Sequence, residues 1–256
     1  MASVRARPAK KKPAPRRHSN TRQRIIDRSI LLFNRYGLRN VAIDHIAAEL
    51  DISPGNLTYH FPRKQDLLAA TLAMLQERMR AALERPAQIG SVREAGEYML
   101  SVYHALWDFR FFFNALTHLL SDPQLRVDYL AFRAWALESI DGELRHFAQR
   151  GYLTAPVAPN TFRLVAENLW ALWLNWLRKQ QVQNPMVVRP SDAALFDCAL
   201  HDWSLLQSVL VPAASHELLD AFRTLLPLHA TQTPPAKSIK RRPAKSVARR
   251  KARDEA

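Results

Sequence analysis

The sequence predicts an all-α protein, in which a small N-terminal helix-turn-helix head precedes a larger helical body. Apolar residues recur three and four positions apart along most of the chain, which is the spacing of one face of a helix. Strand signals are scarce, and the 256 residues include only six glycines. The breaks between helical stretches are marked by proline, or by Asp, Asn and Ser at positions that suit helix caps.

The first two helices of the head are predicted between residues 19 and 50. The first carries apolar residues at helical spacing from Ile25 to Tyr36, and Gly37 follows where a C-terminal cap is expected. Asn20 or Thr21 is expected to cap its start, because both side chains can accept from free N–H groups. The second helix is indicated by an i, i+3, i+4, i+7 stripe of Ile43, Ile46, Ala47 and Leu50.

A very short third helix is predicted after a break at residues 51–52. Ser53 suits an N-cap, and Pro54 suits the first helical position, where no N–H is needed. Leu57 and Phe61 are expected to face the first two helices, which leaves an outer face of Asn56, Thr58, Tyr59 and His60. A helix this short rarely stands alone unless it is presented to something. A helix-turn-helix presents such a face to the major groove of DNA.

Four segments of the stretch Thr21–Lys64 together resemble the N-terminal signature of the TetR family of bacterial transcriptional regulators: Ile46-Ala47, Ile52-Ser53-Pro54-Gly55-Asn56-Leu57, Tyr59-His60-Phe61 and Lys64. The combination is specific, although each segment alone is short. The resemblance implies an all-helical homodimer with a DNA-binding head at residues 19–64 and an effector-binding, dimerising body at residues 65–230.

The resemblance also implies a set of DNA-binding residues. Asn56 and its neighbours would meet base edges, Tyr59 and His60 would meet phosphate, and Lys64 would hold phosphate at a helix N-terminus. The full set is Thr21, Ala42, Ser53, Pro54, Asn56, Thr58, Tyr59, His60 and Lys64. Three positions depart from the family pattern: Ala42 where Thr or Ser often opens the second helix, Asp51 where the turn usually has glycine, and Thr58 where an aromatic residue is frequent.

Basic residues are concentrated at the two ends of the chain. The chain has 37 Lys and Arg against 23 Asp and Glu, a formal net charge of +14. Residues 1–18 carry +7 and residues 231–256 carry another +7, so residues 19–230 are neutral. Both ends are poor in large apolar residues, which predicts disorder. They are either solvated tails or segments that attract DNA phosphate regardless of sequence, and the adjacent head favours the second interpretation.

Other features bear on the location of the protein. No apolar run follows the N-terminal charges as in a signal peptide, and no apolar stretch is long enough to span a membrane. The lone cysteine, Cys198, excludes a disulfide within the chain and fits a reducing compartment. We therefore expect a cytoplasmic, nucleoid-associated protein without a membrane partner.

The body is predicted to consist of helices joined by short connections. Asp122-Pro123 and Ser191 suit helix starts, and Gly151 suits a helix end. The expected helices are 65–84, 91–108, 110–121, 123–150, 160–180, 192–211 and 215–227.

A first aromatic group is expected to line an effector pocket between the body helices, as the resemblance implies. Polar members would orient a bulky, largely apolar or aromatic ligand, although ordinary core is the alternative for most of the aromatic side chains. Phe111, Phe112 and Phe113 cannot all face one way on a helix, so some are expected to face a cavity, a partner or solvent. The candidate ligand-binding residues are Tyr103, His104, Trp107, Arg110, Phe111, Asn114, His118, Trp135 and Trp170.

A second apolar group lies on the two long helices near the end of the body. The helix around residues 169–177 is apolar over more than one stripe, so one side is expected to pack on a partner. By resemblance these helices would pair with their copies in a four-helix dimer interface, with a monomeric core as the alternative. The candidate interface residues are Trp173, Trp176, Leu195, Ala199, Trp203 and Leu206.

An enzyme is the remote alternative. Cys198, His201 and Asp202 share roughly one helix face, but no further motif supplies another ligand or a catalytic base. Neither a phosphate-binding glycine loop nor an HExxH motif occurs, so we expect neither catalysis nor a metal or cofactor. A nucleoid-type architectural protein without an effector is the nearer alternative. The sequence favours a dimeric, ligand-responsive repressor that binds a palindromic operator.

Overall fold

The computed structural model describes residues 16–83 and 89–227, and within these ranges it confirms the predicted all-α fold. The head comprises α1 and a 3-10 turn, then α2 and α3, and α4 leads out of it. The first part of the chain contains α1 (Arg16–Tyr36), η1 (Leu38–Asn40), α2 (Ile43–Glu49), α3 (Pro54–His60) and α4 (Lys64–Leu83). The body continues with α5 (Val92–Asp108), α6 (Arg110–Asn114), α7 (Leu116–Leu119), α8 (Pro123–Gln149), α9 (Phe162–Gln183), α10 (Asp192–Leu206) and α11 (Pro212–Leu225).

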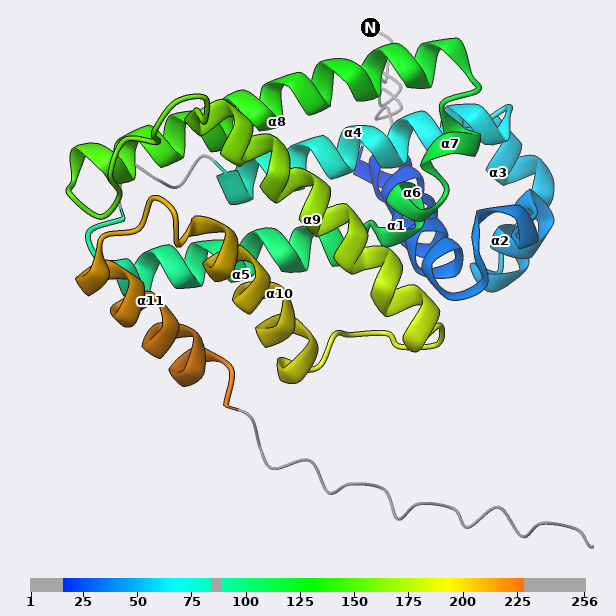
Figure 1. Cartoon of the computed structure of the whole chain (residues 1–256). Helices are drawn as coiled ribbons and strands as arrows, with labels where there is room; N and C mark the ends of the chain where they lie inside the picture. Colours follow the sequence, from blue (N-terminus) through cyan, green and yellow to red (C-terminus); the bar gives the residue numbers. More distant parts are fainter. Residues whose placement is uncertain (1–15, 84–88, 228–256) are drawn as a thin grey trace, which may run out of the picture.

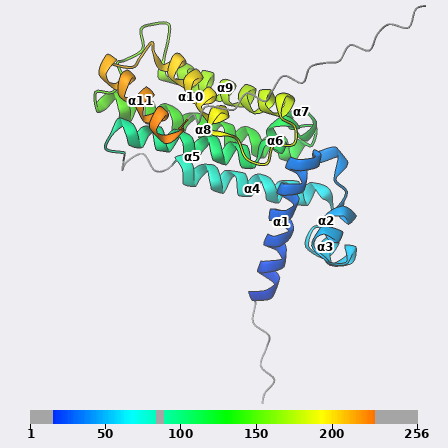
Figure 2. The ribbon, with the colours of Figure 1, turned by 90° about the horizontal axis from the view of Figure 1, so that it is seen from below.

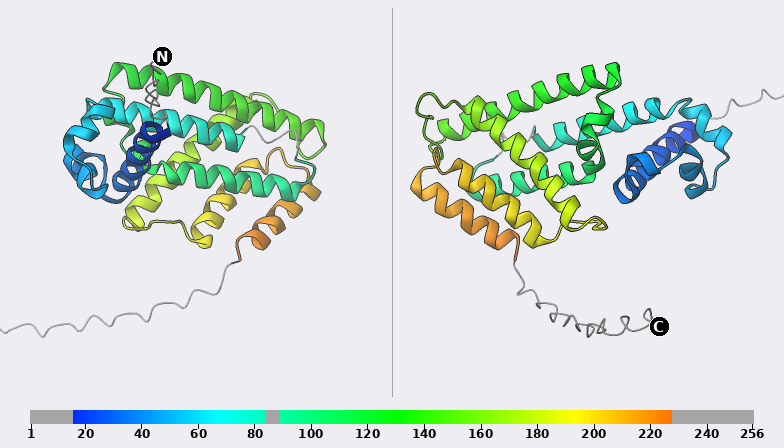
Figure 3. Two further views of the ribbon diagram at one scale, coloured as in Figure 1. Left: turned by 180° about the vertical axis from the view of Figure 1, so that it is seen from behind. Right: turned by 45° about the vertical axis from the view of Figure 1, so that its right-hand side comes forward.

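The head and the far end of the body lie at opposite ends of the molecule. In Figure 1, α2 and α3 occupy one end, and α11 and the start of α5 occupy the other. Figure 2 shows α1–α3 projecting from the body, with α4 running from the head along the body, and Figure 3 shows the same separation from two other sides. In the body, α8 packs on α9, α5 on α11 and α4 on α5. The buried apolar cluster is continuous from Ile25 in α1 to Phe222 in α11.

Cap residues account for most of the predicted helix boundaries. Gly37 and Gly151 adopt left-handed φ angles of 80° and 81°, where glycine is favoured, and each follows a helix as predicted. Asp122 caps α8 by accepting from the N–H groups of Gln124 and Leu125, both at 3.0 Å. Ser191 caps α10 in the same manner at 3.2 Å from Ala194 N.

Four predicted boundaries are wrong. The first helix begins at Arg16, so Asn20 and Thr21 lie inside it rather than at its start. The expected helix 110–121 is broken at Ala115 into α6 and α7. The expected helix 192–211 ends at Leu206, and α11 starts at residue 212 rather than 215, because Pro212 occupies the first helical position.

The proposed tails fall largely outside the described residues. Residues 1–15 and 228–256 lie outside the described residues, while residues 16–18 are in α1. The division between head and body at residues 64 and 65 remains a prediction, and α4 runs across the body from that point. Across the described ranges, no helix is long and apolar enough to cross a membrane.

Candidate nucleic-acid interface and body cavity

The third helix of the head stands on a buried apolar base and exposes a polar face. The hydroxyl of Ser53 accepts from Asn56 N at 3.2 Å, and Pro54 is the first residue of α3, as predicted. Leu57 and Phe61 are 0% and 1% exposed, so they fix α3 on the rest of the head. The side chains of Asn56, Thr58 and Tyr59 are exposed and His60 is half-buried, with the Tyr59 ring stacked edge-on against the imidazole. α3 therefore presents a short row of polar groups outward.

The turn between α2 and α3 depends on an unusual backbone conformation at Asp51. Its φ is 54°, the left-handed region, where the family pattern has glycine. The turn is closed by backbone bonds from Asp51 N to Ala48 O at 3.2 Å and from Ile52 N to Ala47 O at 3.1 Å. An aspartate adopts this conformation more readily than most residues, so the substitution preserves the turn.

Two of the departures from the family pattern change what the head can offer to DNA. Ala42 is exposed at the N-cap position of α2, where its side chain makes no capping bond. The Thr58 hydroxyl lies 3.1 Å from Pro54 O and 3.2 Å from Gly55 O, so its proton is donated within α3. Thr58 can therefore contact a base by accepting a hydrogen bond or through its methyl group.

Lys64 begins α4, as predicted, but its ammonium is engaged inside the head. Its ammonium donates to the carbonyl oxygens of Leu38 and Val41, both at 2.7 Å, and lies 5.6 Å from the centre of the Phe33 ring. An ammonium has three N–H donors, so two are used inside the head. Lys64 therefore fixes η1 and the start of α2 against α4, and at most one donor is left for a phosphate.

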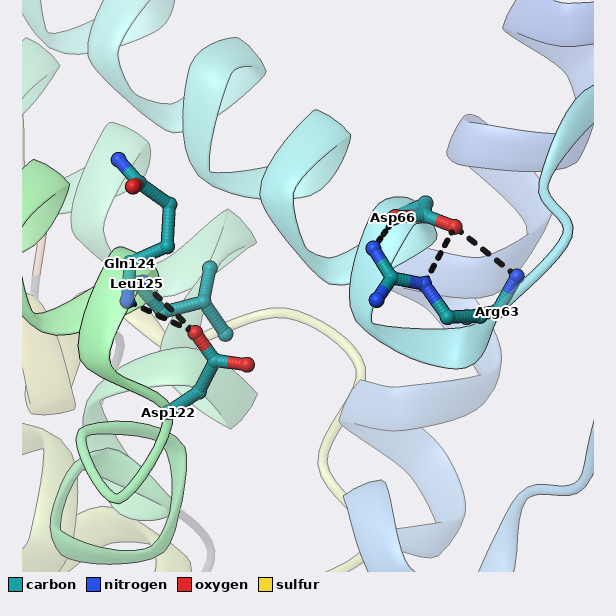
Figure 4. Close-up of polar contacts among 5 residues, drawn as sticks. All are labelled: Arg63, Asp66, Asp122, Gln124 and Leu125. Atoms are coloured by element: carbon teal, nitrogen blue, oxygen red, sulfur yellow. Dashed lines mark hydrogen bonds and ion pairs between the residues drawn. The ribbon is translucent and has the colours of Figure 1, made fainter.

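Two ion pairs that sequence patterns do not identify brace the head. Arg28 of α1 is hydrogen-bonded to Glu49 of α2, and this contact lowers the pKa of the Glu49 carboxyl. Where α4 begins, Arg63 pairs with Asp66 at 2.7 Å, and Asp66 also accepts from Arg63 N at 3.0 Å (Figure 4). The hydrogen bond and charge of Asp66 raise the pKa of the Arg63 guanidinium, with a smaller contribution from Asp122, the cap of α8.

The buried amide of Asn34 joins the head to the body. Its Nδ2 donates to Asp108 O at 2.7 Å, and its Oδ1 accepts from Phe111 N at 3.0 Å. Beside it, the rings of Phe33 and Phe111 have centroids 5.2 Å apart. α1 is therefore tied to the corner between α5 and α6. Sequence analysis missed Asn34, although a polar residue among the buried positions of α1 was a usable signal.

The predicted ligand-binding residues lie in different surroundings, some buried and some exposed. Trp107 and Arg110 hold the segment before α10 instead: Trp107 Nε1 donates to Val188 O at 2.9 Å, and Arg110 donates to Val187 O at 3.0 Å. The exposed members are His104, Asn114 and His118, and Trp135 is half-buried. The buried members are Tyr103, Trp107, Arg110, Phe111 and Trp170.

The three consecutive phenylalanines are all buried, contrary to expectation. Phe111, Phe112 and Phe113 are 3%, 0% and 5% exposed. They do face different ways, but α6 is short and enclosed, so each ring meets a different neighbour: Phe33, Tyr129 and Trp170 respectively. These rings belong to the core.

An apolar cavity of about 80 Å³ lies elsewhere, at the end of the body far from the head. Its wall comes from α5, α8, α9, α10 and α11 together with the turn after α8. The lining residues are Val92, Ala95, Tyr98, Met99, Ile140, Glu143, Leu144, Phe147, Tyr152, Leu153, Leu169, Trp173, Leu206, Leu210, Ala214 and Leu218. Glu143 is the one charged side chain in this set.

Two family descriptions match most of the region between residues 25 and 218. Residues 25–71 match the bacterial regulatory proteins of the tetR family, and residues 74–218 match the TetR bacterial transcriptional repressors. The second match alone covers more than half of the chain.

The chain belongs to the TetR family. It is therefore a DNA-binding transcriptional regulator and not an enzyme, and the head described above is its DNA-binding part.

Known TetR relatives extend over most of this chain. A probable HTH-type transcriptional regulator YttP of Bacillus subtilis (strain 168) is 23% identical over 184 residues, which cover 68% of this chain and 85% of that protein. A TetR-family regulator from Marinobacter aquaeolei VT8 superposes with a TM-score of 0.70 and 29% identity, covering 81% of this chain and 99% of that chain. A putative regulator from Saccharomonospora viridis, solved in complex with choline, gives a TM-score of 0.58 and 20% identity over 75% of this chain and 99% of that chain.

The residues predicted for a TetR dimer interface are mostly inside their own chain. Trp173 and Trp176 are 4% and 2% exposed, and Trp176 Nε1 donates to Ala194 O at 3.0 Å between α9 and α10. Leu195, Ala199 and Leu206 are buried as well, and half-buried Trp203 donates to Ser215 O at 3.0 Å. The five buried side chains form the contacts of α9, α10 and α11 with one another, which contradicts their prediction as interface residues, whereas half-buried Trp203 remains a candidate.

The three side chains considered for catalysis, Cys198, His201 and Asp202, differ in burial and in their partners. Cys198 is fully buried, whereas His201 is exposed and lies 3.8 Å from Asp197. Asp202 is completely buried; it accepts from Tyr103 Oη and, at 2.8 Å, from Trp173 Nε1. Burial raises the pKa of the Asp202 carboxyl to about 7. In the described residues, no three His, Cys, Asp or Glu side chains gather to hold a metal ion.

Proposed function

We propose that this TetR-family regulator is a homodimeric repressor that releases a palindromic operator when a small, largely apolar effector binds in the body. The presentation of α3 carries this proposal: a polar face of Asn56, Thr58 and Tyr59 stands on the buried side chains of Leu57 and Phe61. Two such heads on a two-fold dimer would read half-sites about one helical turn, roughly 34–36 Å, apart.

We assign the dimer interface to the exposed faces of α9 and α10, instead of to the buried side chains of Trp173 and Trp176. Leu164 and Ala171 of α9 and Leu200 of α10 are exposed, and Leu172 and Leu205 are half-exposed beside them. Leu164, Ala171 and Leu172 recur at helical spacing along α9, and Leu200 lies on the adjacent α10, so pairing with a second copy would bury these apolar side chains. Sedimentation of a monomer at micromolar concentration would contradict this arrangement.

For the effector, we place the site in the cavity between α5, α8, α9, α10 and α11. It is enclosed by apolar side chains with one carboxyl group among them, which is the composition expected of a small-molecule site. The choline complex of the Saccharomonospora viridis protein shows a small molecule bound to a protein of this fold. The aromatic set predicted from the sequence is replaced by the lining of this cavity.

The link between effector and operator would run through the corner that holds Asn34. The α5 helix contributes to the cavity near its start and ends at Asp108, whose carbonyl accepts from Asn34 of α1. A shift of α5 on ligand binding would therefore move α1 and the head. An effector acts only if its affinity differs between the two head positions.

Operator binding is the direct test of this function. DNA flanking the coding gene would be searched for a palindrome and footprinted with the full-length chain, with random DNA of equal length as the control. A repressor retains a large operator-over-random ratio as the salt concentration rises, because base contacts persist when phosphate contacts weaken. Loss of that ratio would favour the architectural alternative, in which the basic ends of the chain supply most of the affinity.

A further inference from the structure

The carboxyl group of Glu143 is the unusual feature of the body cavity. Its Oε2 atom is buried and has no hydrogen-bond partner among the described residues. Burial raises the pKa of this carboxyl to about 7, and no described side chain offsets that effect with a positive charge. A buried polar atom without a partner lowers the stability of the fold. A ligand that donates a hydrogen bond to Glu143 Oε2 would remove this cost.

The neighbours of Glu143 narrow the chemistry of that partner. Aromatic rings of Tyr98, Phe147, Tyr152 and Trp173 form part of the wall, and Phe147 and Tyr152 have ring centroids 6.3 Å apart. Aromatic faces attract cations, and the attraction is strongest where water is excluded. Burial raises the pKa of the Tyr98 hydroxyl and the Glu143 charge adds to that shift; both residues line the cavity.

The rest of the wall is hydrocarbon. Aliphatic side chains from α5, α8 and α11 supply it, among them Met99, Ile140 and Leu218. The cavity volume of about 80 Å³ is smaller than the engineered apolar cavity of about 150 Å³ that takes up benzene. Benzene has six non-hydrogen atoms, so by proportion a ligand of about three non-hydrogen atoms fits this space without rearrangement of the wall.

We propose that the cavity binds a small organic ammonium ion, whose N–H group donates to Glu143 Oε2 and whose hydrocarbon part packs against the aromatic and aliphatic wall. This inference rests on the proposed function, because it names the chemical class of the effector for that same cavity. A neutral molecule of the same shape fills the apolar wall equally well and leaves the carboxyl without a charged partner.

The test compares two probes with the same carbon skeleton, ethylamine and ethanol, on the full-length protein at pH 7.5. The amine is protonated at this pH, since alkyl ammonium groups lose their proton near pH 10.4. Calorimetric or NMR titration is expected to give at least tenfold tighter binding for the amine. In Glu143→Gln the amine is expected to lose at least tenfold in affinity while the alcohol is unchanged. Glu138→Gln, the same substitution at an exposed position of α8, is the matched control and is expected to bind both probes like the parent chain.

Equal binding of amine and alcohol to the parent chain would overturn the proposal. That comparison needs no substitution, so it remains decisive if Glu143→Gln fails to fold. A preference for the amine that survives in a folded Glu143→Gln protein would overturn it as well.

Operator affinity separates this inference from the proposed function. Glu143-dependent amine binding with no change in operator affinity supports the ligand class and contradicts the effector role of the cavity. A neutral compound that releases DNA equally well from the parent chain and from Glu143→Gln supports the effector role and overturns the ligand class.

Discussion

At the scale of single residues, the outer face of α3 divides into groups that should specify sequence and groups that should hold the backbone of DNA. We expect Asn56→Ala to relax the preference at particular bases, and Tyr59→Ala, a side chain 74% exposed, to weaken binding to all sequences alike. Each specific contact is expected to contribute about 1–3 kcal/mol of discrimination. Binding assays against a library of operator variants measure both effects. A uniform loss in Asn56→Ala would contradict the division.

Lys64 has a structural role that its place in the family signature conceals. Lys64→Ala is expected to destabilise the head by about 1–3 kcal/mol, because the carbonyl groups of Leu38 and Val41 lose their partner. Chemical unfolding and hydrogen exchange of residues 38–42 measure this effect. Arg39→Ala, at an exposed cation of the same turn, is the matched control. Full stability of Lys64→Ala with weakened DNA binding would restore phosphate as its main partner.

The buried carboxyl of Asp202 gives stability a specific dependence on pH. Its pKa rises from 3.8 in the unfolded chain to about 7 in the fold, so its contribution is complete below pH 4 and is lost as pH rises to about 7. Asp202→Asn does not titrate, and its stability relative to the parent chain should therefore increase by up to about 4 kcal/mol between pH 4 and pH 8. Urea unfolding of both proteins across this range tests the prediction. A difference that stays constant with pH would contradict it.

At the scale of elements, α2 lacks the side-chain cap that α3, α5, α8, α9 and α10 have. Ala42 has the extended backbone of an N-cap residue, with φ −85° and ψ 162°, but cannot accept a hydrogen bond from the first turn. Ala42→Ser is expected to stabilise the protein by about 1 kcal/mol through that bond. The midpoint of thermal unfolding measures the gain, and Ala48→Ser, inside the same helix and exposed, is the control. No gain in Ala42→Ser would mean that water already satisfies the helix start.

The elements also show what sequence patterns can and cannot predict. Caps such as Ser53, Asp122 and Ser191 act within a few residues, so the starts of α3, α8 and α10 followed from the sequence. The break at residues 51–52 was predicted too, but the left-handed backbone of Asp51 occupies a position that only the family resemblance singled out.

The roles of the aromatic residues could not be predicted from the sequence, because helical periodicity predicts that a side chain is buried but not which residues it packs against. Trp173 and Trp176 pack within their own chain instead of on a partner, and Phe111 is part of the junction between head and body. The cavity was missed for the same reason. Its lining residues come from five helices that are spread along the sequence. Its one charged residue, Glu143, has the sequence context of an ordinary solvent-exposed residue on a helix.

At the scale of the whole molecule, Asn34 is the residue on which communication between head and body should depend. We expect Asn34→Ala to leave Asp108 O and Phe111 N without partners and to cost about 1–3 kcal/mol of stability. Its larger consequence is a reduced effect of any cavity ligand on operator affinity, measured by titrating DNA with and without ligand. Asn40→Ala is the control, because it removes an exposed hydrogen bond within the head, from the side-chain amide of Asn40 to Tyr36 O. Unchanged coupling in Asn34→Ala would move the link to another contact, such as that of α4 with α5.

The same junction limits how freely this regulator could be recombined with its relatives. Residues 19–64 look like an exchangeable reading unit, since one helix continues out of them and the DNA-facing groups all lie inside. However, Asn34 and Phe33 of α1 contact Asp108 and Phe111 at the corner between α5 and α6. A head from another protein grafted at residue 64 would therefore bring an α1 that does not match this corner. A hybrid sensor built from this chain would inherit operator choice from α3 and responsiveness from α1. The practical seam for such grafts lies between α1 and α2, inside the head.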